Sequence, residues 1–266
     1  MARTDPAREL ASTLEQLTNH PDPNALVDTA LSGLARVDLW STDFFLVLFE
    51  LIKRCELVEL EIQRLPLDDD VKTDAVRSIQ RMRTYLNQRQ IMTQKISQAK
   101  SLLGGQNITI LKMLSSQVRE NISYELLSSD QRDDLLDDVR KLIGWLEQQQ
   151  DQETDFIRQA LIEGLQSFEF RLDRLSWFGA GYVIDGLKDV LHAYLALQGA
   201  IPEVSNGDEL LNAMLMKTKV FMGKAVKAFN FAKGTSEDAG WVLQVYGAAS
   251  ALNDGSQTIS GFLGGS

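Results

Sequence analysis

The stretch TDFFLVLFELIKRCELVELEIQR (residues 42–64) decides the fold class, because its apolar residues cover several faces of one helix. Ser41 or Thr42 can cap the start of this helix, since their hydroxyl oxygens accept a hydrogen bond from the first free amides. Pro66 ends it, because proline cannot continue a helix. A helix with several apolar faces packs against several neighbours. We therefore expect residues 43–64 to lie at the centre of a helical core.

Helical spacing of apolar residues continues along the chain, and no stretch alternates as a half-buried strand does. Two prolines in the turn NHPDPN (residues 19–24) stop a first short helix. The second helix runs to about Val37. The other expected helices cover roughly 6–18, 43–64, 68–103, 107–127, 130–150, 152–178, 177–199, 209–233 and 237–252. Ser128 or Ser129 can cap the helix over residues 130–150. The sequence thus predicts an all-α multi-helix bundle of long helices.

Composition changes near residue 164, because four of the 18 glycines precede it and 14 lie at or after it. We expect a long-helix bundle over residues 1–163 and a smaller Gly/Ala-rich region of amphipathic helices over residues 164–266. The boundary is soft, and the two parts can pack as one domain. Small residues let helix backbones approach closely, so the second part is either a compact helical cluster or a region that rearranges.

The net charge limits which partners we expect the chain to bind, and the cysteine content bears on its cellular compartment. The net charge of −10 argues against coating of a nucleic acid or an anionic membrane by the whole chain, although a local basic surface can still bind one. The single cysteine, Cys55, allows no intramolecular disulfide. The first residues lack an apolar core of signal-peptide length, and no window reaches about 18 uncharged apolar residues. We expect a cytoplasmic protein.

Acidic and basic residues are sorted along the chain. Residues 75–118 contain no Asp or Glu, whereas residues 120–155 are strongly acidic. One interpretation is that the basic helix and the acidic segment complement each other inside one bundle. The other is a surface for an anionic partner, with the candidate residues Arg77, Arg81, Arg83 and Arg89. Aromatic residues do not interleave with these arginines, which disfavours nucleic acid.

A second basic segment covers residues 208–234 and has the pattern of an amphipathic helix. Apolar residues from Leu211 to Phe229 follow steps of three and four, and lysines fall on the opposite side. Such a helix can pack on a core, dock into an acidic partner or lie on an anionic membrane. The candidate contact residues are Lys217, Lys224, Lys227, Phe221 and Phe229.

The helix GYVIDGLKDVLHAYLALQG (residues 181–199) is apolar except for one polar line. Asp185, Asp189 and His192 stand at i, i+4 and i+7, with Lys188 beside them. Carboxylates and an imidazole on one face can bind a metal or transfer a proton. Lys188 opposes a cation, and an Asp185–Lys188 surface pair on a mostly buried helix is the simpler interpretation. The line would face a lumen if the chain oligomerises.

Known catalytic patterns are missing from the sequence. It contains no phosphate-binding loop, no HExxH and no nucleophile elbow. The glycines of GAGYVIDG (residues 179–186) follow no strand, and we expect them to let the chain break after Trp177 and Phe178. Cys55 lies within an apolar helix, where a thiol usually packs.

These observations favour a non-enzymatic helical interaction or regulatory protein, with no cofactor, that binds a protein partner or itself. A membrane-acting helical effector, which forms a pore or associates with a membrane through its C-terminal helices, is the alternative. A metal- or ligand-binding sensor that uses Asp185, Asp189 and His192 is the third hypothesis.

Overall fold

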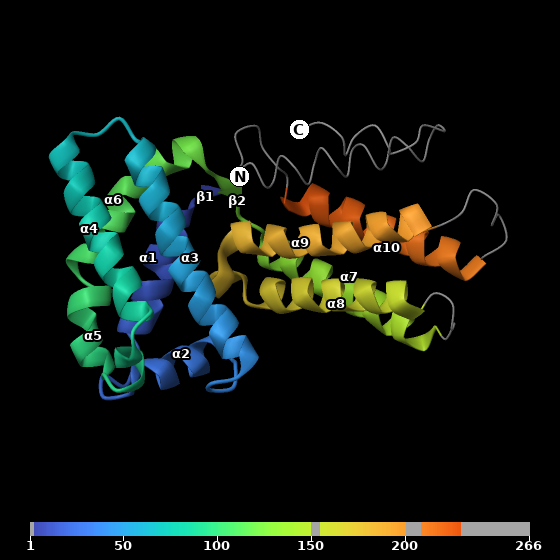
Figure 1. Ribbon diagram of the computed structural model, residues 1–266, viewed down its shortest axis with the longest axis horizontal. Coiled ribbons are helices and arrows are strands. Elements are labelled where there is room, and N and C mark those ends of the chain that lie inside the picture. The colour runs from blue at the N-terminus through green and yellow to red at the C-terminus, as the bar shows by residue number, and fades with distance from the viewer. Residues whose placement is uncertain (1–2, 150–154, 201–208, 230–266) are drawn as a thin grey trace. The chain divides into compact units, whose positions relative to one another are not determined.

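The computed structural model describes residues 3–149, 155–200 and 209–229, and it is an all-α multi-helix bundle (Figure 1). The chain divides into two compact units. The first contains residues 1–126 and 174–182, and the second contains residues 127–173 and 183–266. The change of composition near residue 164 lies inside a helix of the second unit, and the expected division into residues 1–163 and 164–266 stays a prediction.

Helix α3 (Thr42–Arg64) lies at the centre of the first unit, as residues 43–64 were expected to do. It packs against α1 (Pro6–Thr18), α4 (Asp69–Leu86) and α6 (Gln106–Asn121). This unit also contains α2 (Val27–Ala35), α5 (Ile96–Leu103) and the first residues of α9 (Leu175–Ala200). The Ser41 hydroxyl caps α3 by accepting a hydrogen bond from the amide of Phe44 at 3.1 Å. The predicted cap is confirmed.

The single long helix expected over residues 68–103 is wrong. The chain forms α4, the 3₁₀-helix η1 (Arg89–Met92) and α5 in its place. Residues 94–97 instead hydrogen-bond to the backbone of residues 23–27, through Val27 N to Gln94 O and Ile96 N to Ala25 O. Residues 23–27 thus bond to backbone amides and carbonyls of residues 94–97 that a continuous helix would need for its own hydrogen bonds. The helix is therefore interrupted here.

A short strand pair also interrupts the expected helix over residues 107–127. The helix α6 ends at Asn121, and β2 (Tyr124–Glu125) pairs antiparallel with β1 (Arg3–Thr4). Arg3 lies opposite Glu125, and Thr4 lies opposite Tyr124. The strands fix the start of α1 beside the end of α6.

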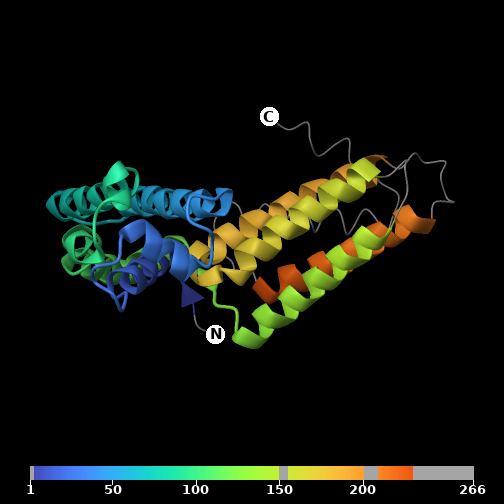
Figure 2. The same ribbon diagram turned by 90° about the horizontal axis from the view of Figure 1, so that it is seen from below.

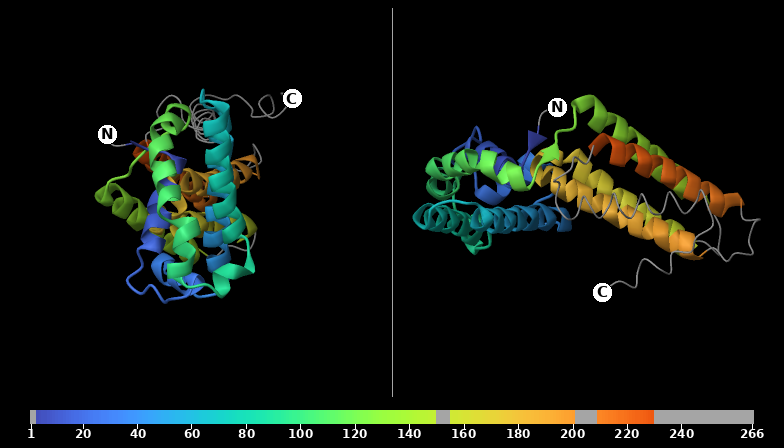
Figure 3. Two further views of the ribbon diagram at one scale, coloured as in Figure 1. Left: turned by 90° about the vertical axis from the view of Figure 1, so that its left-hand side faces the viewer. Right: turned by 90° about the horizontal axis from the view of Figure 1, so that it is seen from above.

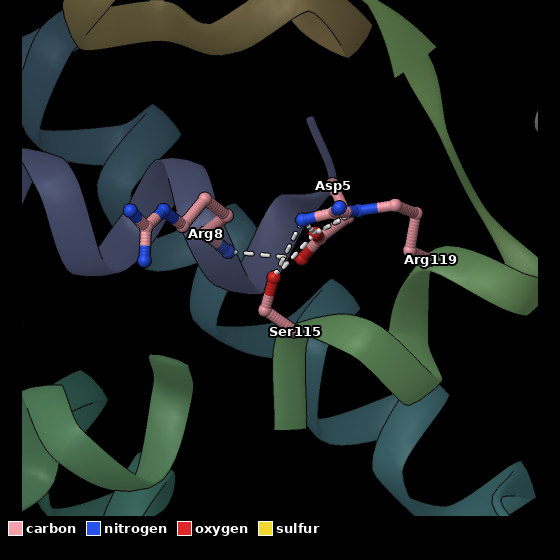
Figure 4. A network of polar contacts seen from close by, with 4 residues as sticks. All are labelled: Asp5, Arg8, Ser115 and Arg119. Carbon is pink, nitrogen blue, oxygen red and sulfur yellow. Dashed lines mark hydrogen bonds and ion pairs between the residues drawn. The ribbon is translucent and has the colours of Figure 1, made fainter. Parts of the chain in front are cut away.

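Asp5 connects α1 to α6 through a buried polar network (Figure 4). Its Oδ1 caps α1 by accepting a hydrogen bond from the amide of Arg8 at 2.9 Å. Its Oδ2 accepts hydrogen bonds from the Ser115 hydroxyl at 2.7 Å and from Arg119 Nη2 at 3.1 Å. One fully buried carboxylate therefore serves as a helix cap and as the ionic partner of another helix.

We expect the substitution Asp5→Ala to lower the free energy of unfolding of the first unit by about 2–4 kcal/mol, because it removes the cap and leaves Ser115 and Arg119 without their acceptor. Urea denaturation measures this change. Asp74→Ala is the control, since Asp74 is exposed and pairs with Arg77 on the surface. Equal losses in the two variants would contradict the role of the network.

The second unit contains α7 (Ser129–Gln148), α8 (Asp155–Asp173), most of α9 (Leu175–Ala200) and α10 (Glu209–Phe229). Helix α7 packs against both α8 and α10 (Figures 2 and 3). The predicted Ser128 cap is confirmed, because its hydroxyl accepts from the amide of Gln131 at 3.1 Å. The expected helix over residues 237–252 and the end of the one over 209–233 lie outside the described residues.

Helices α8 and α9 approach closely at glycines of the second unit. A Cβ at Gly164 would lie 3.3 Å from the Cα of Val190, and one at Gly186 would lie 3.2 Å from the Cα of Phe168. Both of these atoms belong to the backbone of the neighbouring helix, and the Arg171 side chain also lies 3.0 Å from the Cβ at Gly186. Small residues thus allow close helix packing here, as the composition predicted.

We expect Gly164→Ala to destabilise the second unit by about 1 kcal/mol, because α9 must move to admit the methyl group. Gly144→Ala is the matched control in α7, where an added Cβ meets no atom within 4 Å. This control should gain about 0.5–1 kcal/mol from helix propensity. The comparison is made by thermal or urea denaturation, and a gain for both variants would refute the close packing.

Candidate functional site

The N-terminal half of α3 exposes apolar side chains on the surface of the first unit. Phe45 is 50% exposed and Phe49 is 51% exposed, although Phe44, Val47 and Leu51 on the same helix are buried. The two exposed rings stand one helical turn apart and so share a face. The predicted core helix therefore also presents an aromatic surface, which the sequence interpretation missed.

This surface borders a hollow of about 690 Å³, which we call the aromatic groove. Its lining comes from α3, the end of α4 and η1, and includes Trp40, Phe45, Phe49, Ile52, Leu86, Arg89 and Met92. A second hollow of about 420 Å³ shares Ile52, Asn87 and Gln88 with it and is lined by Glu56 and Arg83. An apolar hollow thus continues into a polar one that contains charged groups.

Trp40 adopts a backbone conformation that favours glycine, with φ 64°. A bulky side chain rarely occupies this region, and the strain costs of order 1–3 kcal/mol. The conformation brings the indole within 5.0 Å of the Phe44 ring and 5.9 Å of the Phe45 ring, between centroids. The aromatic cluster of Trp40, Phe44 and Phe45 therefore forms although the Trp40 backbone is strained.

Two of the four predicted arginines, Arg83 and Arg89, line these hollows. Arg77 and Arg81 are exposed on α4, and Arg77 pairs with Asp74 at 3.1 Å. Arg83 lies 3.3 Å from Glu59 and 3.6 Å from Glu56, both on α3. Arg89 is exposed and lines the aromatic groove. Arg83 therefore forms ion pairs with acidic residues of α3 and lines the polar hollow, whereas Arg89 lines the aromatic groove.

The predicted contact residues of α10 separate into two groups. Lys217, Lys224 and Lys227 are exposed, as their helical positions predict. Phe221 and Phe229 are buried, and Phe221 packs edge-to-face on Phe168 with centroids 5.7 Å apart. These two phenylalanines therefore belong to the core of the second unit and form no contact surface in this structure.

Exposed apolar residues of α10 are Met216 and Val220, each 57% exposed. They line a hollow of about 380 Å³ between α7 and α10, together with Trp145, Lys217 and Lys224. Lys217 Nζ lies 4.9 Å from the centre of the Trp145 ring, and Lys224 Nζ lies 2.7 Å from Asp138. The lysines of this hollow thus already have partners within the second unit.

The polar line of the 181–199 helix forms ordinary ion pairs. Asp185 lies 3.3 Å from Lys188, and Asp189 lies 3.3 Å from Arg171 of α8. His192 is exposed. Among the residues that the structure describes, no group of three or more His, Cys, Asp or Glu is placed to hold a metal ion. The predicted surface pair of Asp185 and Lys188 is confirmed.

Cys55 is fully buried in α3, and this burial raises the pKa of its thiol to about 12. A thiolate is therefore not accessible at neutral pH, which removes Cys55 as a nucleophile.

A second site in the first unit lies where α9 breaks. Gly179 has φ 75° and ψ 164°, so the helix stops after Phe178 and starts again at Ala180, as GAGYVIDG predicted. A side chain here would be strained, and its Cβ would lie 2.1 Å from Glu9 Oε2 and 3.1 Å from Arg54 Nη2. Glycine at this position is thus required by conformation and by space.

Both ends of the broken helix are bonded to charged side chains. Arg54 Nη2 donates to the carbonyl of Trp177 at 2.7 Å, and the amide of Ala180 donates to Glu9 Oε1 at 3.0 Å. Carbonyls at a helix C-terminus attract a cation, and amides at an N-terminus attract an anion. The α1 carboxylate and the α3 guanidinium therefore replace the helical hydrogen bonds that the break removes.

The rest of residues 174–182, which we call the strap, is also bonded within the first unit. Arg174 donates through Nε to the carbonyl of Ala35 at 3.0 Å and through Nη2 to that of Arg36 at 2.9 Å. The Thr13 hydroxyl donates a hydrogen bond to the carbonyl of Ser176 at 3.2 Å. Trp177 and Phe178 are buried. The strap thus contacts α1, α2 and α3.

Burial dominates the electrostatics of the break. It raises the pKa of Glu9 to about 7, against the opposing effects of Arg54 and the Ala180 amide. Burial also lowers the pKa of Arg54, while Glu9 and then Glu50 raise it. The sequence interpretation missed Glu9 and Arg54. The one available signal was an arginine placed among apolar residues of the central helix.

No protein-family model, no curated protein and no solved structure matches this chain. Among the described residues, no helix has the length and apolar character needed to cross a bilayer.

We expect the Cys55 thiol to resist a disulfide reagent in the native protein at pH 8, because it is buried and protonated. The same reagent should label one thiol per chain in urea. Absorbance of the released thiolate follows the reaction. Rapid labelling of the native protein would mean that α3 is not a stable core helix.

Proposed function

We propose that this chain is a non-enzymatic helical interaction protein whose first unit binds an amphipathic, acidic helix of a protein partner in the aromatic groove. The observation that carries the proposal is the pair of half-exposed rings of Phe45 and Phe49 beside a 690 Å³ hollow. Large exposed aromatic side chains at a hollow are typical of hot spots in protein interfaces.

The arrangement of the groove favours a helix as its occupant. Phe45, Phe49 and Ile52 repeat at steps of four and three along α3, and η1 and the end of α4 also contribute to the lining. An amphipathic helix inserts apolar side chains with the same spacing into such a groove. The apolar face of the partner would then cover the two phenylalanines.

The charges around the groove favour acidic residues on the partner. Arg89 lines the aromatic groove, and the adjoining hollow contains Arg83 with Glu56. Lys53 Nζ lies 4.8 Å from the centre of the Phe49 ring. These cations are local exceptions in a chain with net charge −10, and they would orient an acidic helix more than they would add affinity.

A second candidate function is association with an anionic membrane through α10. Met216 and Val220 are exposed on the same helix as Lys217, Lys224 and Lys227, which is the composition of an interfacial helix. Because Lys217 and Lys224 have partners in the second unit, this surface is the weaker of the two. Self-association and a cytoplasmic address stay predictions.

Two synthetic amphipathic helices of about 20 residues, alike in their apolar face but flanked by Glu or by Lys, test the main proposal. We expect the acidic peptide to bind more tightly, and the double variant Phe45→Ser/Phe49→Ser to weaken its binding at least tenfold, because the apolar anchors lose their contact area. Arg89→Glu should reduce the preference for the acidic peptide. Fluorescence anisotropy of labelled peptides measures each affinity.

Met113→Ser is the matched control, because Met113 is 72% exposed on α6, outside the groove lining. It should leave peptide binding unchanged. Binding that is insensitive to the phenylalanine changes would refute the groove. Flotation with anionic liposomes, if abolished by Lys217→Glu/Lys224→Glu and not by the phenylalanine changes, would support the membrane function instead.

A further inference from the structure

The exposed face of α3 extends beyond the aromatic groove. Leu60 lies about three turns after Phe49 on the same face of the helix and is 44% exposed. It lines neither the aromatic groove nor the polar hollow beside it. Lys53 and Glu56 stand between these two apolar residues and are also exposed. The face thus has an apolar residue at each end and one charge of each sign between them.

These residues are arranged symmetrically along the helix. Phe49 and Leu60 lie equally far from the point midway between positions 54 and 55, and so do Lys53 and Glu56. A two-fold rotation about an axis through that point exchanges the members of each pair. An isologous interface requires this property, because each copy must present the same surface to the other. The face is therefore suited to pack on a second copy of this chain.

Both charged side chains can bond across such an interface. The side chain of Lys53 is 53% exposed, and its Nζ lies 4.0 Å from Glu50 Oε1. The side chain of Glu56 is 54% exposed, and its Oε1 lies 3.6 Å from Arg83 Nη1. Neither distance is that of a hydrogen bond. A closer ion pair with a second copy would therefore not require either residue to give up a hydrogen bond in these pairs.

The two charges select the antiparallel arrangement. When α3 packs antiparallel on α3 of a second copy, Lys53 lies opposite Glu56 of that copy, and Glu56 lies opposite its Lys53. A parallel arrangement would place each lysine opposite a lysine and each glutamate opposite a glutamate. Opposite charges across a helix pair fix its orientation, whereas like charges oppose it.

We propose that this chain forms a weak two-fold dimer in which α3 packs antiparallel on α3 of a second copy. Phe49 of each copy packs on Leu60 of the other, and Lys53 pairs with Glu56 twice. A single helix pair is smaller than a standard protein interface, so we expect a Kd of the order of 10 µM. The dimer does not rest on the proposed partner helix, because Lys53, Glu56 and Leu60 do not line the aromatic groove. Phe49 belongs to both surfaces, so the second copy and a partner helix would exclude each other.

Sedimentation equilibrium of the full chain at about 1–200 µM tests the dimer. We expect the mean mass to rise with concentration from that of one chain towards that of two. Lys53→Glu and Glu56→Lys should each weaken association about tenfold, because two like-charge contacts replace two attractive ones. The double variant Lys53→Glu/Glu56→Lys restores opposite charges across the interface, so its Kd should return to within about threefold of the original value.

Lys141→Glu is the matched control, because it changes the net charge as much as Lys53→Glu does and its exposed side chain lies on α7. It should leave the Kd unchanged. A chain that stays monomeric at about 200 µM would overturn the dimer. Single variants that associate as strongly as the unmodified chain would overturn it too, and so would a folded double variant that is as weak as the single ones.

Disulfide crosslinking tests the orientation without changing the charges. A mixture of Phe49→Cys and Leu60→Cys chains should form a mixed disulfide, because these positions lie opposite each other in the antiparallel pair. Leu60→Cys alone should crosslink little, since its two copies would lie about 16 Å apart along the pair. The native thiol of Cys55 is buried and does not compete. Mass spectrometry identifies the products, and self-crosslinking of Leu60→Cys as efficient as the mixed reaction would overturn the antiparallel dimer.

Discussion

The buried guanidinium of Arg54 is the constraint on which the path of the chain through the first unit depends. An arginine stays charged in a protein, so its burial is tolerated where its donors find acceptors. Arg54 finds one in the carbonyl of Trp177, which lies 123 residues further along the chain. The end of a short helix segment supplies this acceptor because its last carbonyls have no helical partner. The need to bond one charge in α3 thus holds residues 174–182 in the first unit.

One face of α1 carries the polar side chains that organise the rest of this unit. Asp5, Glu9 and Thr13 follow one another at steps of four residues, and each bonds to a different part of the chain. Asp5 binds α6, Glu9 binds the restarted helix α9, and Thr13 contacts both Arg54 and the strap. Polar side chains in a stripe of this spacing usually mark the exposed face of a helix. Here Asp5 and Thr13 are buried inside the first unit.

That stripe explains how far the sequence could predict the structure. The apolar spacing of residues 42–64, the caps at Ser41 and Ser128, and the break after Phe178 are local signals, and each was predicted correctly. The break between α4 and α5 depends on backbone bonds to residues 23–27, which no local pattern contains. The stripes of Asp5, Glu9 and Thr13 and of Asp185, Asp189 and His192 have similar spacing, yet the first is largely buried and the second is largely exposed. Spacing identifies a face, but the neighbours that cover it decide its role. The same applies to Phe45 and Phe49, which are half-exposed on a helix whose Phe44, Val47 and Leu51 are buried.

The strap also affects the order in which the protein can be made. The first unit needs residues 174–182, and the ribosome adds them after it has made residues 127–173 of the second. Until then Arg54 lacks the Trp177 carbonyl and Glu9 lacks the Ala180 amide, so the nascent first unit would have to keep these charges hydrated. A fragment that ends at residue 126 would have the same deficiency permanently. The two units therefore cannot be separated by dividing the chain at a single position, because residues 174–182 of the first unit follow residues 127–173 of the second.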